Sequence, residues 1–110
     1  MTTGVQTILA NQNASVDVTT DWYTTEQRGS WSLDVIILSQ LDRDIDITME
    51  VTNDIVSDTK YHCFKIIKEP VHRLLGVSFI YDKLPFDYCR WVINGNSSSG
   101  RYKVLFNERN

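Results

Sequence analysis

Three aspartates at alternate positions form the clearest cluster of charged side chains in the sequence. Asp42, Asp44 and Asp46 stand in the stretch Asp-Arg-Asp-Ile-Asp. Calcium loops use carboxylates spaced in this way, because a hard cation binds several oxygen atoms. However, no glycine stands where such a loop bends, and Ile45 begins a strand-like pattern. Alternate residues of a strand share one face, so we expect these carboxylates to be solvated and to hold no metal.

The histidines and cysteines are the other side chains that could bind a metal or act as nucleophile and base. They are His62, Cys63, His72 and Cys89. Their spacing matches no zinc pattern such as paired CxxC or HExxH. His62 and Cys63 are adjacent, so on a strand they point to opposite faces and cannot act together. Neither a GxSxG elbow nor a phosphate-binding glycine loop occurs. The sequence therefore predicts a protein that is not an enzyme and has no cofactor.

Four aromatic residues could form a platform that packs on a sugar ring: Trp22, Tyr23, Trp31 and Trp91. Trp31 and Trp91 lie in strand-like runs, where such side chains usually pack in the core. Trp22 and Tyr23 lie in a polar, threonine-rich stretch, and large apolar side chains in such a place favour a contact surface. Trp22 and Tyr23 are therefore candidate partner-binding residues. A carbohydrate-binding module is one alternative function.

Strands must position these residues, because the chain shows period-two alternation and no convincing helical spacing over three turns. In residues 44–52 the apolar side chains of Ile45, Ile47, Met49 and Val51 all fall on one face. Turn-forming residues separate this stretch from further runs rich in β-branched and aromatic residues. Those runs are 14–19, 30–39, 61–67, 77–81, 88–93 and 101–106. The pattern predicts an all-β protein, a single antiparallel β-sandwich that is jelly-roll-like.

Three segments carry more detailed expectations. Val35-Ile36-Ile37-Leu38 is apolar on both faces, which predicts a central strand that is covered twice. In residues 14–19, Val16 and Val18 are expected on one face. Residues 69–75 are the best candidate for a short helix, with a loop as the alternative, since Pro70 suits the first turn of either.

Composition is that of one globular domain. The chain has 110 residues, of which 42% are hydrophobic and 23% charged, and no apolar run approaches the roughly 18 residues of a membrane span. The net charge of −3 argues against a nucleic-acid surface. We expect no nucleic acid and no membrane as partners. The first residues show no secretory signal, so Cys63 and Cys89 are expected to be reduced and buried, with a disulfide left open.

The opening segment, residues 1–13, is polar and has three sizeable apolar side chains. It is either a first strand or loosely packed arm on the domain, or an arm that docks on a neighbour. The domain proper is then 14–110. If the segment docks on a neighbour, the candidate partner-binding residues in it are Val5, Ile8 and Leu9.

Four short motifs appear in order along residues 30–109. They are Ser-Leu-Asp-Val-Ile at 32–36, Met-Glu-Val-Thr-Asn-Asp at 49–54, Leu-Pro-Phe-Asp-Tyr-Cys-Arg-Trp-Val at 84–92 and Ser-Ser-Gly-Arg-Tyr-Lys-Val at 98–104. In this order and spacing the chain resembles the small β-sandwich structural domains of tailed-phage virions. It departs from that pattern after Asn53-Asp54, where Tyr61 stands in place of a frequent tryptophan, and in a longer insert at 71–76.

Arg90 lies in a strand-like run between Cys89 and Trp91, so a partly buried guanidinium there needs partners. Asp54 or Asp87 is expected to supply a bidentate carboxylate. An intersubunit contact and a solvated arginine are the alternatives.

The resemblance implies a virion structural protein. We expect a capsid decoration protein that binds the assembled shell in many copies, with the major capsid protein or another virion protein as its partner. It would form a homo-oligomer or a symmetric array, and lie in the virion or, during assembly, in the host cytoplasm. Another virion component, such as a head-fibre base, a head-completion protein or a tail protein, is the first alternative. A carbohydrate-binding module, with a glycan as partner, is the second.

Overall fold

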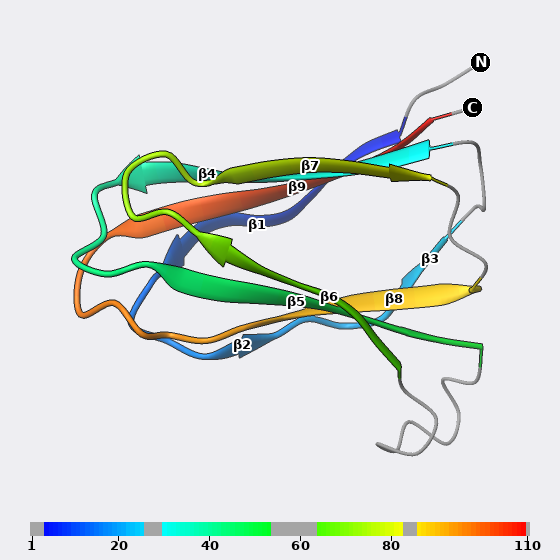
Figure 1. Ribbon diagram of the computed structural model, residues 1–110, viewed down its shortest axis with the longest axis horizontal. Helices are drawn as coiled ribbons and strands as arrows, with labels where there is room; N and C mark the ends of the chain where they lie inside the picture. Colours follow the sequence, from blue (N-terminus) through cyan, green and yellow to red (C-terminus); the bar gives the residue numbers. More distant parts are fainter. Residues whose placement is uncertain (1–3, 26–29, 54–63, 83–85, 110) are drawn as a thin grey trace.

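The computed structural model describes residues 4–25, 30–53, 64–82 and 86–109, and these fold into two packed β-sheets (Figure 1). The described residues form strands and turns and no helix, so none forms a helix of the length and apolar character that crossing a membrane requires. The strands are β1 (Gly4–Asn13), β2 (Val18–Thr19), β3 (Tyr23–Thr24), β4 (Ser30–Ser39), β5 (Ile45–Thr52), β6 (Phe64–Val71), β7 (Val77–Asp82), β8 (Tyr88–Ile93) and β9 (Arg101–Arg109).

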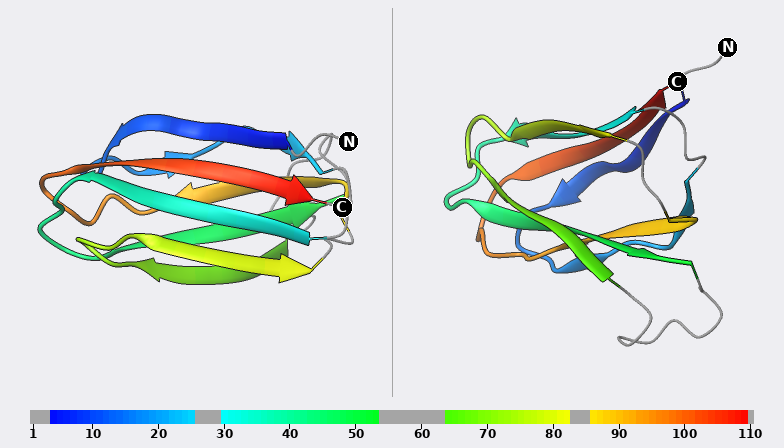
Figure 2. Two further views of the ribbon diagram at one scale, coloured as in Figure 1. Left: turned by 90° about the horizontal axis from the view of Figure 1, so that it is seen from above. Right: turned by 45° about the vertical axis from the view of Figure 1, so that its right-hand side comes forward.

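The strand pairing is nested. β1 pairs with β9, β2 and β3 with β8, β4 with β7, and β5 with β6, all antiparallel. The first half of the chain is thus one side of a long ribbon and the second half is the other. Two further ladders, β4 with β9 and β5 with β8, close the ribbon into one sheet with the order β1-β9-β4-β7 and a second with the order β2-β8-β5-β6 (Figure 2). This rolled ribbon is a jelly roll, and the predicted β-sandwich is confirmed.

The two sheets enclose one apolar core. Ile45, Ile47, Met49 and Val51 are all buried, at most 1% exposed, as the alternation of residues 44–52 predicts. A chain of aromatic contacts joins the sheets: Tyr23 to Trp91, Trp91 to Phe106, Phe106 to Trp31, and Trp31 to Phe79, with ring centroids 5.0–6.0 Å apart. Trp31 and Trp91 are therefore core residues, as expected.

The opening segment is a strand over its described part. β1 lies at the edge of its sheet and pairs with β9 from Gly4, opposite Glu108, to Asn13, opposite Arg101, with two register shifts between them. Ile8 is 9% exposed and belongs to the core, and Leu9 packs against it. Residues 4–13 are thus a strand of the sandwich, one of the interpretations that the sequence left open.

Two local predictions are wrong. Residues 69–71 end β6 and residues 72–76 form a tight turn, so no helix begins at Pro70, and of the two alternatives only the loop is found, over 72–76. Pro70 is accepted because β6 is an edge strand, where a missing N–H breaks no inner ladder. Val16 and Val18 do not share a buried face, since β2 is only two residues long and Val16 is 48% exposed.

Candidate interaction surface

The outer face of β4 is exposed, although the sequence predicted that it would be covered. β4 is an inner strand of its sheet, but Ile36 is 39% exposed and Leu38 is 46% exposed. The apolar run at 35–38 was expected to be covered on both faces, and the described residues cover only the face that carries Val35. The prediction failed because a sheet in a two-layer sandwich has only one covered face.

The turn between β6 and β7 adds two leucines at the same end of the sandwich. Leu74 is 49% exposed and Leu75 is 82% exposed. A Cβ atom on Gly76 would lie 3.7 Å from the Cα atom of Ile36, so the turn lies directly beside the end of β4. In Figure 1 this turn and the end of β4 are neighbours at the left of the molecule. We call Ile36, Leu38, Leu74 and Leu75 the turn-end cluster.

The turn-end cluster contains most of the exposed large apolar side chains among the described residues. Only two others are exposed to a similar degree, Val16 and Ile80. Ile80 is separated from the cluster along the sheet by a hydrogen bond from the Ser78 hydroxyl to Asp34. Four large apolar side chains at one end of a small domain are a candidate contact surface.

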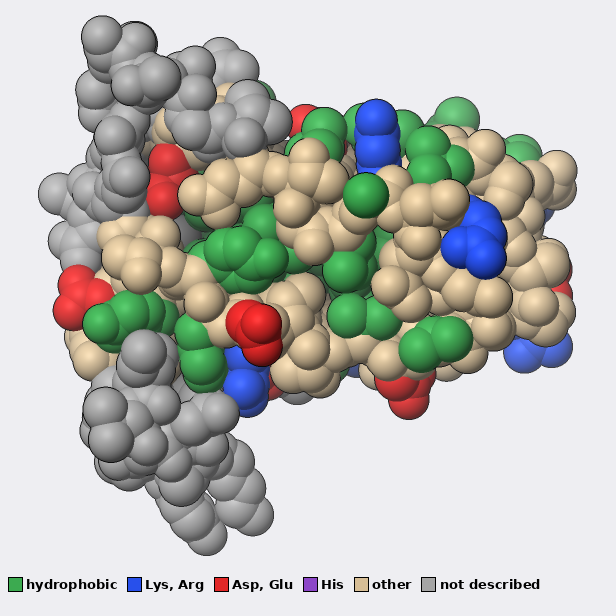
Figure 3. All heavy atoms as spheres, turned by 180° about the vertical axis from the view of Figure 1, so that it is seen from behind, with side chains coloured by type: hydrophobic (Ala, Val, Ile, Leu, Met, Phe, Trp, Pro, Cys, Tyr) green, Lys and Arg blue, Asp and Glu red, His purple; other side chains and the backbone are tan. Residues whose placement is uncertain are grey.

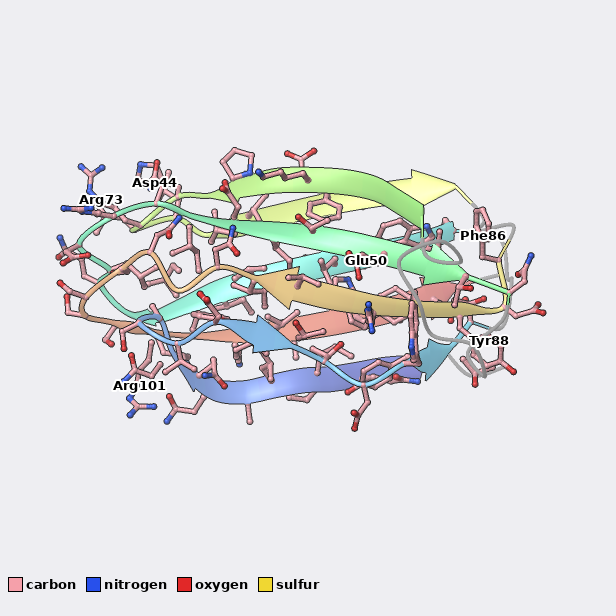
Figure 4. All side chains as sticks on the ribbon, turned by 90° about the horizontal axis from the view of Figure 1, so that it is seen from below. Asp44, Glu50, Arg73, Phe86, Tyr88 and Arg101 are labelled. Carbon is pink, nitrogen blue, oxygen red and sulfur yellow. The ribbon has the colours of Figure 1, made fainter. Side chains whose placement is uncertain are left out.

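Charged side chains surround the turn-end cluster. Lys103 lies opposite Ile36 in β9, and Arg101 lies opposite Ser39. Arg73 of the turn donates its backbone N–H to Asp44 at 2.9 Å, and its guanidinium lies 4.0 Å from the same carboxylate. Figure 4 shows Arg73, Asp44 and Arg101 at this end and Phe86 and Tyr88 at the other. An apolar centre with a charged rim is the usual layout of a protein interface.

His72 holds the turn in shape. Its Nδ1 atom accepts hydrogen bonds from the backbone N–H groups of Leu74 and Leu75, both at 3.1 Å. The backbone of His72 also exchanges two hydrogen bonds with Gly76, at 2.9 and 3.3 Å. The exposed leucines are thus presented by a hydrogen-bonded turn. His62 and Cys63, the neighbouring pair in the sequence, lie outside the described residues.

The candidate partner-binding residues from the sequence lie elsewhere. The side chain of Val5 lies outside the described part of the structure, and Ile8 is buried in the core. Leu9 and Tyr23 are half-buried, and Tyr23 belongs to β3 rather than to a loop. On the side of the sandwich that bears β1, β2 and β3, apolar side chains form a strip between the two sheet edges (Figure 3). The structure does not join these residues to the turn-end cluster.

Trp22 and Arg90 form a second feature, on the outer face of the other sheet. The Arg90 guanidinium lies 4.4 Å from the centre of the Trp22 ring, and its Nε atom donates to Glu50 Oε1 at 2.8 Å. Both charged side chains are 21% exposed. One face of Trp22 is therefore covered by a cation, which is a stabilising contact in itself.

Arg90 has a carboxylate partner that the sequence did not suggest. The structure gives Arg90 the carboxylate of Glu50, which lies directly opposite it in the β5–β8 ladder. Asp54 lies outside the described residues, and Asp87 donates its backbone N–H to Asn53 at 2.9 Å. Glu50 was missed because strand register, which decides the neighbour, cannot be read from one strand alone.

The three alternating aspartates have separate protein partners. Asp44 binds the backbone of Arg73, and Asp46 lies 4.0 Å from the ammonium group of Lys68. Asp42 accepts hydrogen bonds from the Ser98 hydroxyl and N–H and from the Ser97 hydroxyl at 2.8 Å, and these bonds, that of the Ser98 hydroxyl most, lower the pKa of Asp42. Asp42 thus ties the loop before β9 to the loop before β5. The described residues contain no group of three metal-ligating side chains.

Cys89 is a free thiol in the core. It is 0% exposed, and burial, with a smaller contribution from Glu108, raises its pKa to about 12. A thiol that stays protonated at neutral pH is a poor nucleophile. Cys89 therefore acts as a small apolar core residue.

Comparison with known proteins adds little. No family model matches the chain, and no curated protein matches it. A solved structure described by the words "Bacillus endospore appendages form a novel family of disulfide-linked pili" aligns with 96% of this chain and 87% of its own, at 12% identity and a TM-score of 0.40. At that TM-score the likeness carries no conclusion about fold or function.

Proposed function

We propose that this protein is a structural component of a tailed-phage virion and that it decorates the assembled capsid shell in many copies. The turn-end cluster is the observation that carries the proposal. Leu75 is 82% exposed at the tip of a turn whose shape is fixed by His72, and Ile36 and Leu38 lie exposed beside it. Side chains of this kind are stabilised when a partner buries them.

Burial of the turn-end cluster would stabilise each contact only modestly, as expected for a protein that binds in many copies. Burying apolar surface contributes about 25 cal/mol for each Å², so four large side chains contribute a few kcal/mol. A single such contact is weak. When many linked copies bind one regular shell, each further contact forms at a high effective concentration and the whole layer stays attached.

Two observations, the fold and the sequence resemblance, support the proposal of a virion protein. Jelly rolls recur in viral capsid proteins and in lectins, which is an analogy at the level of fold. The resemblance of residues 30–109 to phage virion domains favours the first of these two classes. The major capsid protein is the expected partner, and another virion position, in the head or the tail, would use the same apolar end.

A carbohydrate-binding module is less well supported. Sugar rings pack on an exposed aromatic face, and one face of Trp22 is already covered by the Arg90 guanidinium. Trp31 and Trp91 are buried and cannot contact a glycan.

The test has two stages. Mass spectrometry of purified virions should find the protein at a copy number comparable with that of the shell protein, and its absence from the particles would reject the proposal. Recombinant protein should then bind particles that lack it, and Leu75→Asp combined with Leu74→Asp should reduce that binding by about tenfold or more, since a buried charge without a partner opposes binding.

Val16→Asp is the matched control. Val16 is also an exposed apolar residue, at 48%, but it lies in the loop that joins β1 to β2, outside β4 and the β6–β7 turn that form the turn-end cluster. The control should bind like the wild type. If both variants bind equally well, the attachment surface lies elsewhere, and the strip between β1 and β3 becomes the next candidate.

A further inference from the structure

We propose that two copies of the chain pair through the free edge of β7, antiparallel and around a two-fold axis, so that their four-stranded sheets join into one. The inference starts from the sheet edges. An edge strand presents unpaired N–H and C=O groups to any other strand, and proteins that stay monomeric protect these edges. In this sandwich the edge strands are β1 and β7 in one sheet, and β6 and the short β2 and β3 in the other.

Three of these edges carry a recognised form of protection. β1 has two register shifts, between Thr7 and Leu9 and between Leu9 and Gln12, which bend the edge. β6 contains Pro70, two lysines and a register shift against β5. β2 and β3 are only two residues long. Each feature makes regular pairing with another strand unfavourable.

β7 has none of these features. Its sequence, Val-Ser-Phe-Ile-Tyr-Asp, has no proline and no lysine, and its six residues pair with β4 in unbroken register from Val77 to Asp82. Among the described strands only β4 pairs with it. Figure 2 shows β7 at the rim of the sandwich, on the side away from β1. A regular, apolar edge of this kind is suited to accept a strand.

Ile80 indicates that the occupant is a second β7. It is 74% exposed on the outer face of the sheet, next to a small hollow lined by Ser30 and Ser32. In a joined sheet, residues directly opposite each other must point to the same face. A two-fold pairing centred on Ile80 satisfies this rule, because it places Ile80 opposite Ile80 of the second copy and Ser78 opposite Asp82. The two most exposed side chains of the edge then cover each other, and cross-strand pairs of β-branched residues stabilise a sheet.

The contact is small. An edge of six residues buries less than the roughly 800 Å² per partner of a standard interface, so the dimer is weak in free solution. It becomes important where copies are already close together, because pairing is then intramolecular in effect. The inference does not depend on the shell, since β7 and the turn-end cluster are separate surfaces.

Disulfide trapping in the full-length protein tests the register directly. Directly opposite residues have Cα atoms about 4.5–5.5 Å apart, within the range that a disulfide spans. Ile80→Cys should therefore form a covalent dimer under mild oxidation. Ser78→Cys is the matched control on the same face of the same strand, since its two copies would lie four residues apart, at about 13 Å. Val16→Cys reports random collisions of an exposed thiol.

The expected result is cross-linking of Ile80→Cys at least about tenfold faster than of either control, because pairing raises the effective concentration of the two thiols. Equal rates for Ile80→Cys and Val16→Cys would overturn the proposal, and so would faster cross-linking of Ser78→Cys.

A second measurement uses the wild type and needs no variant. Hydrogen exchange of the β7 amides should slow as protein concentration rises, while that of β1 stays constant. Exchange of β7 that does not depend on concentration, up to millimolar protein, would also reject the dimer. If the wild-type protein does not bind shells but Ile80→Cys still cross-links, the proposed function alone is rejected.

Discussion

Arg90 and Glu50 show how much depends on one contact between side chains. Their Nε–Oε1 distance is 2.8 Å, and each side chain is only 21% exposed. Removing one partner leaves the other charge partly desolvated, so Glu50→Gln and Arg90→Gln should each lower the free energy of unfolding by about 1–2 kcal/mol. The double variant should be less destabilised than the sum of the two, by about 1 kcal/mol, in a urea-unfolding cycle.

The exposed pair Arg73 and Asp44 is the control for this cycle. Its atoms are 4.0 Å apart and its side chains are about half exposed, at 48% and 50%. Exposed pairs typically contribute little, so the corresponding coupling should be below about 0.5 kcal/mol. Equal coupling in the two pairs would mean that the burial of Arg90 has no energetic effect.

Two buried groups predict how stability depends on alkaline pH. Burial raises the pKa of Cys89 from 9.0 to about 12 and the pKa of Tyr102 from 10.0 to about 12. Between these values the unfolded chain loses protons that the folded protein keeps, so the stabilisation present below pH 9 is lost as the pH rises toward 12. The melting temperature should fall steadily over this range.

Tyr102→Phe separates the two contributions. The Tyr102 hydroxyl is buried with no hydrogen-bond partner among the described residues, so its removal should leave the stability at pH 7 unchanged or higher by up to about 1 kcal/mol. The variant should also lose less stability between pH 10 and 12 than the wild type. If the variant lost more stability than the wild type between pH 10 and 12, Tyr102 would not contribute to the alkaline loss of stability.

At the scale of elements, the sequence predicts best where one physical rule acts alone. The alternation at 44–52 predicted β5 and its buried face, because period two has one structural meaning. Sequence-based prediction failed for the helix alternative at 69–75, because Pro70 suits the first turn of a helix and an edge strand equally well. It failed again at Ile36 and Leu38, because apolar residues on both faces can mean a second covering layer or a surface for a partner. Glu50 was not predicted as a partner of Arg90 for a related reason, since register arises only when strands meet.

Gly76 is the residue on which the turn-end cluster depends for its position. Its φ angle is +68°, and a Cβ atom there would lie 2.0 Å from the carbonyl oxygen of Val35. Gly76→Ala therefore combines a left-handed backbone conformation with an overlap against β4, and should destabilise the protein by about 2–4 kcal/mol. Thermal unfolding would measure this, with the exposed substitution Ser78→Ala expected to change little. A neutral Gly76→Ala would show that the turn can move away from β4.

At the scale of the whole molecule, the nested pairing makes each half of the chain depend on the other. Every ladder joins a strand from residues 4–52 to a strand from residues 64–109. Among the described strands, no two from the same half pair with each other. The first and last strands lie side by side at one end, where Gly4 is opposite Glu108 (Figure 1). Folding must therefore bring distant segments together, which predicts refolding in milliseconds to seconds rather than in microseconds.

The same topology predicts the behaviour of the two halves as separate peptides. Residues 1–57 and 58–110 should each be unfolded alone, because single strands without partners leave their backbone groups unpaired and form no core. Mixed in equal amounts, they should form a one-to-one complex with the far-UV circular dichroism of the intact protein. Trp91, the single tryptophan of the second peptide, should become buried between Tyr23 and Phe106, which contact it at 5.4 and 5.0 Å. A second half that carries Trp91→Ala should bind far more weakly, since a truncated core tryptophan costs about 3–5 kcal/mol. If either peptide folds alone, the ladders between the halves are not what holds this jelly roll together.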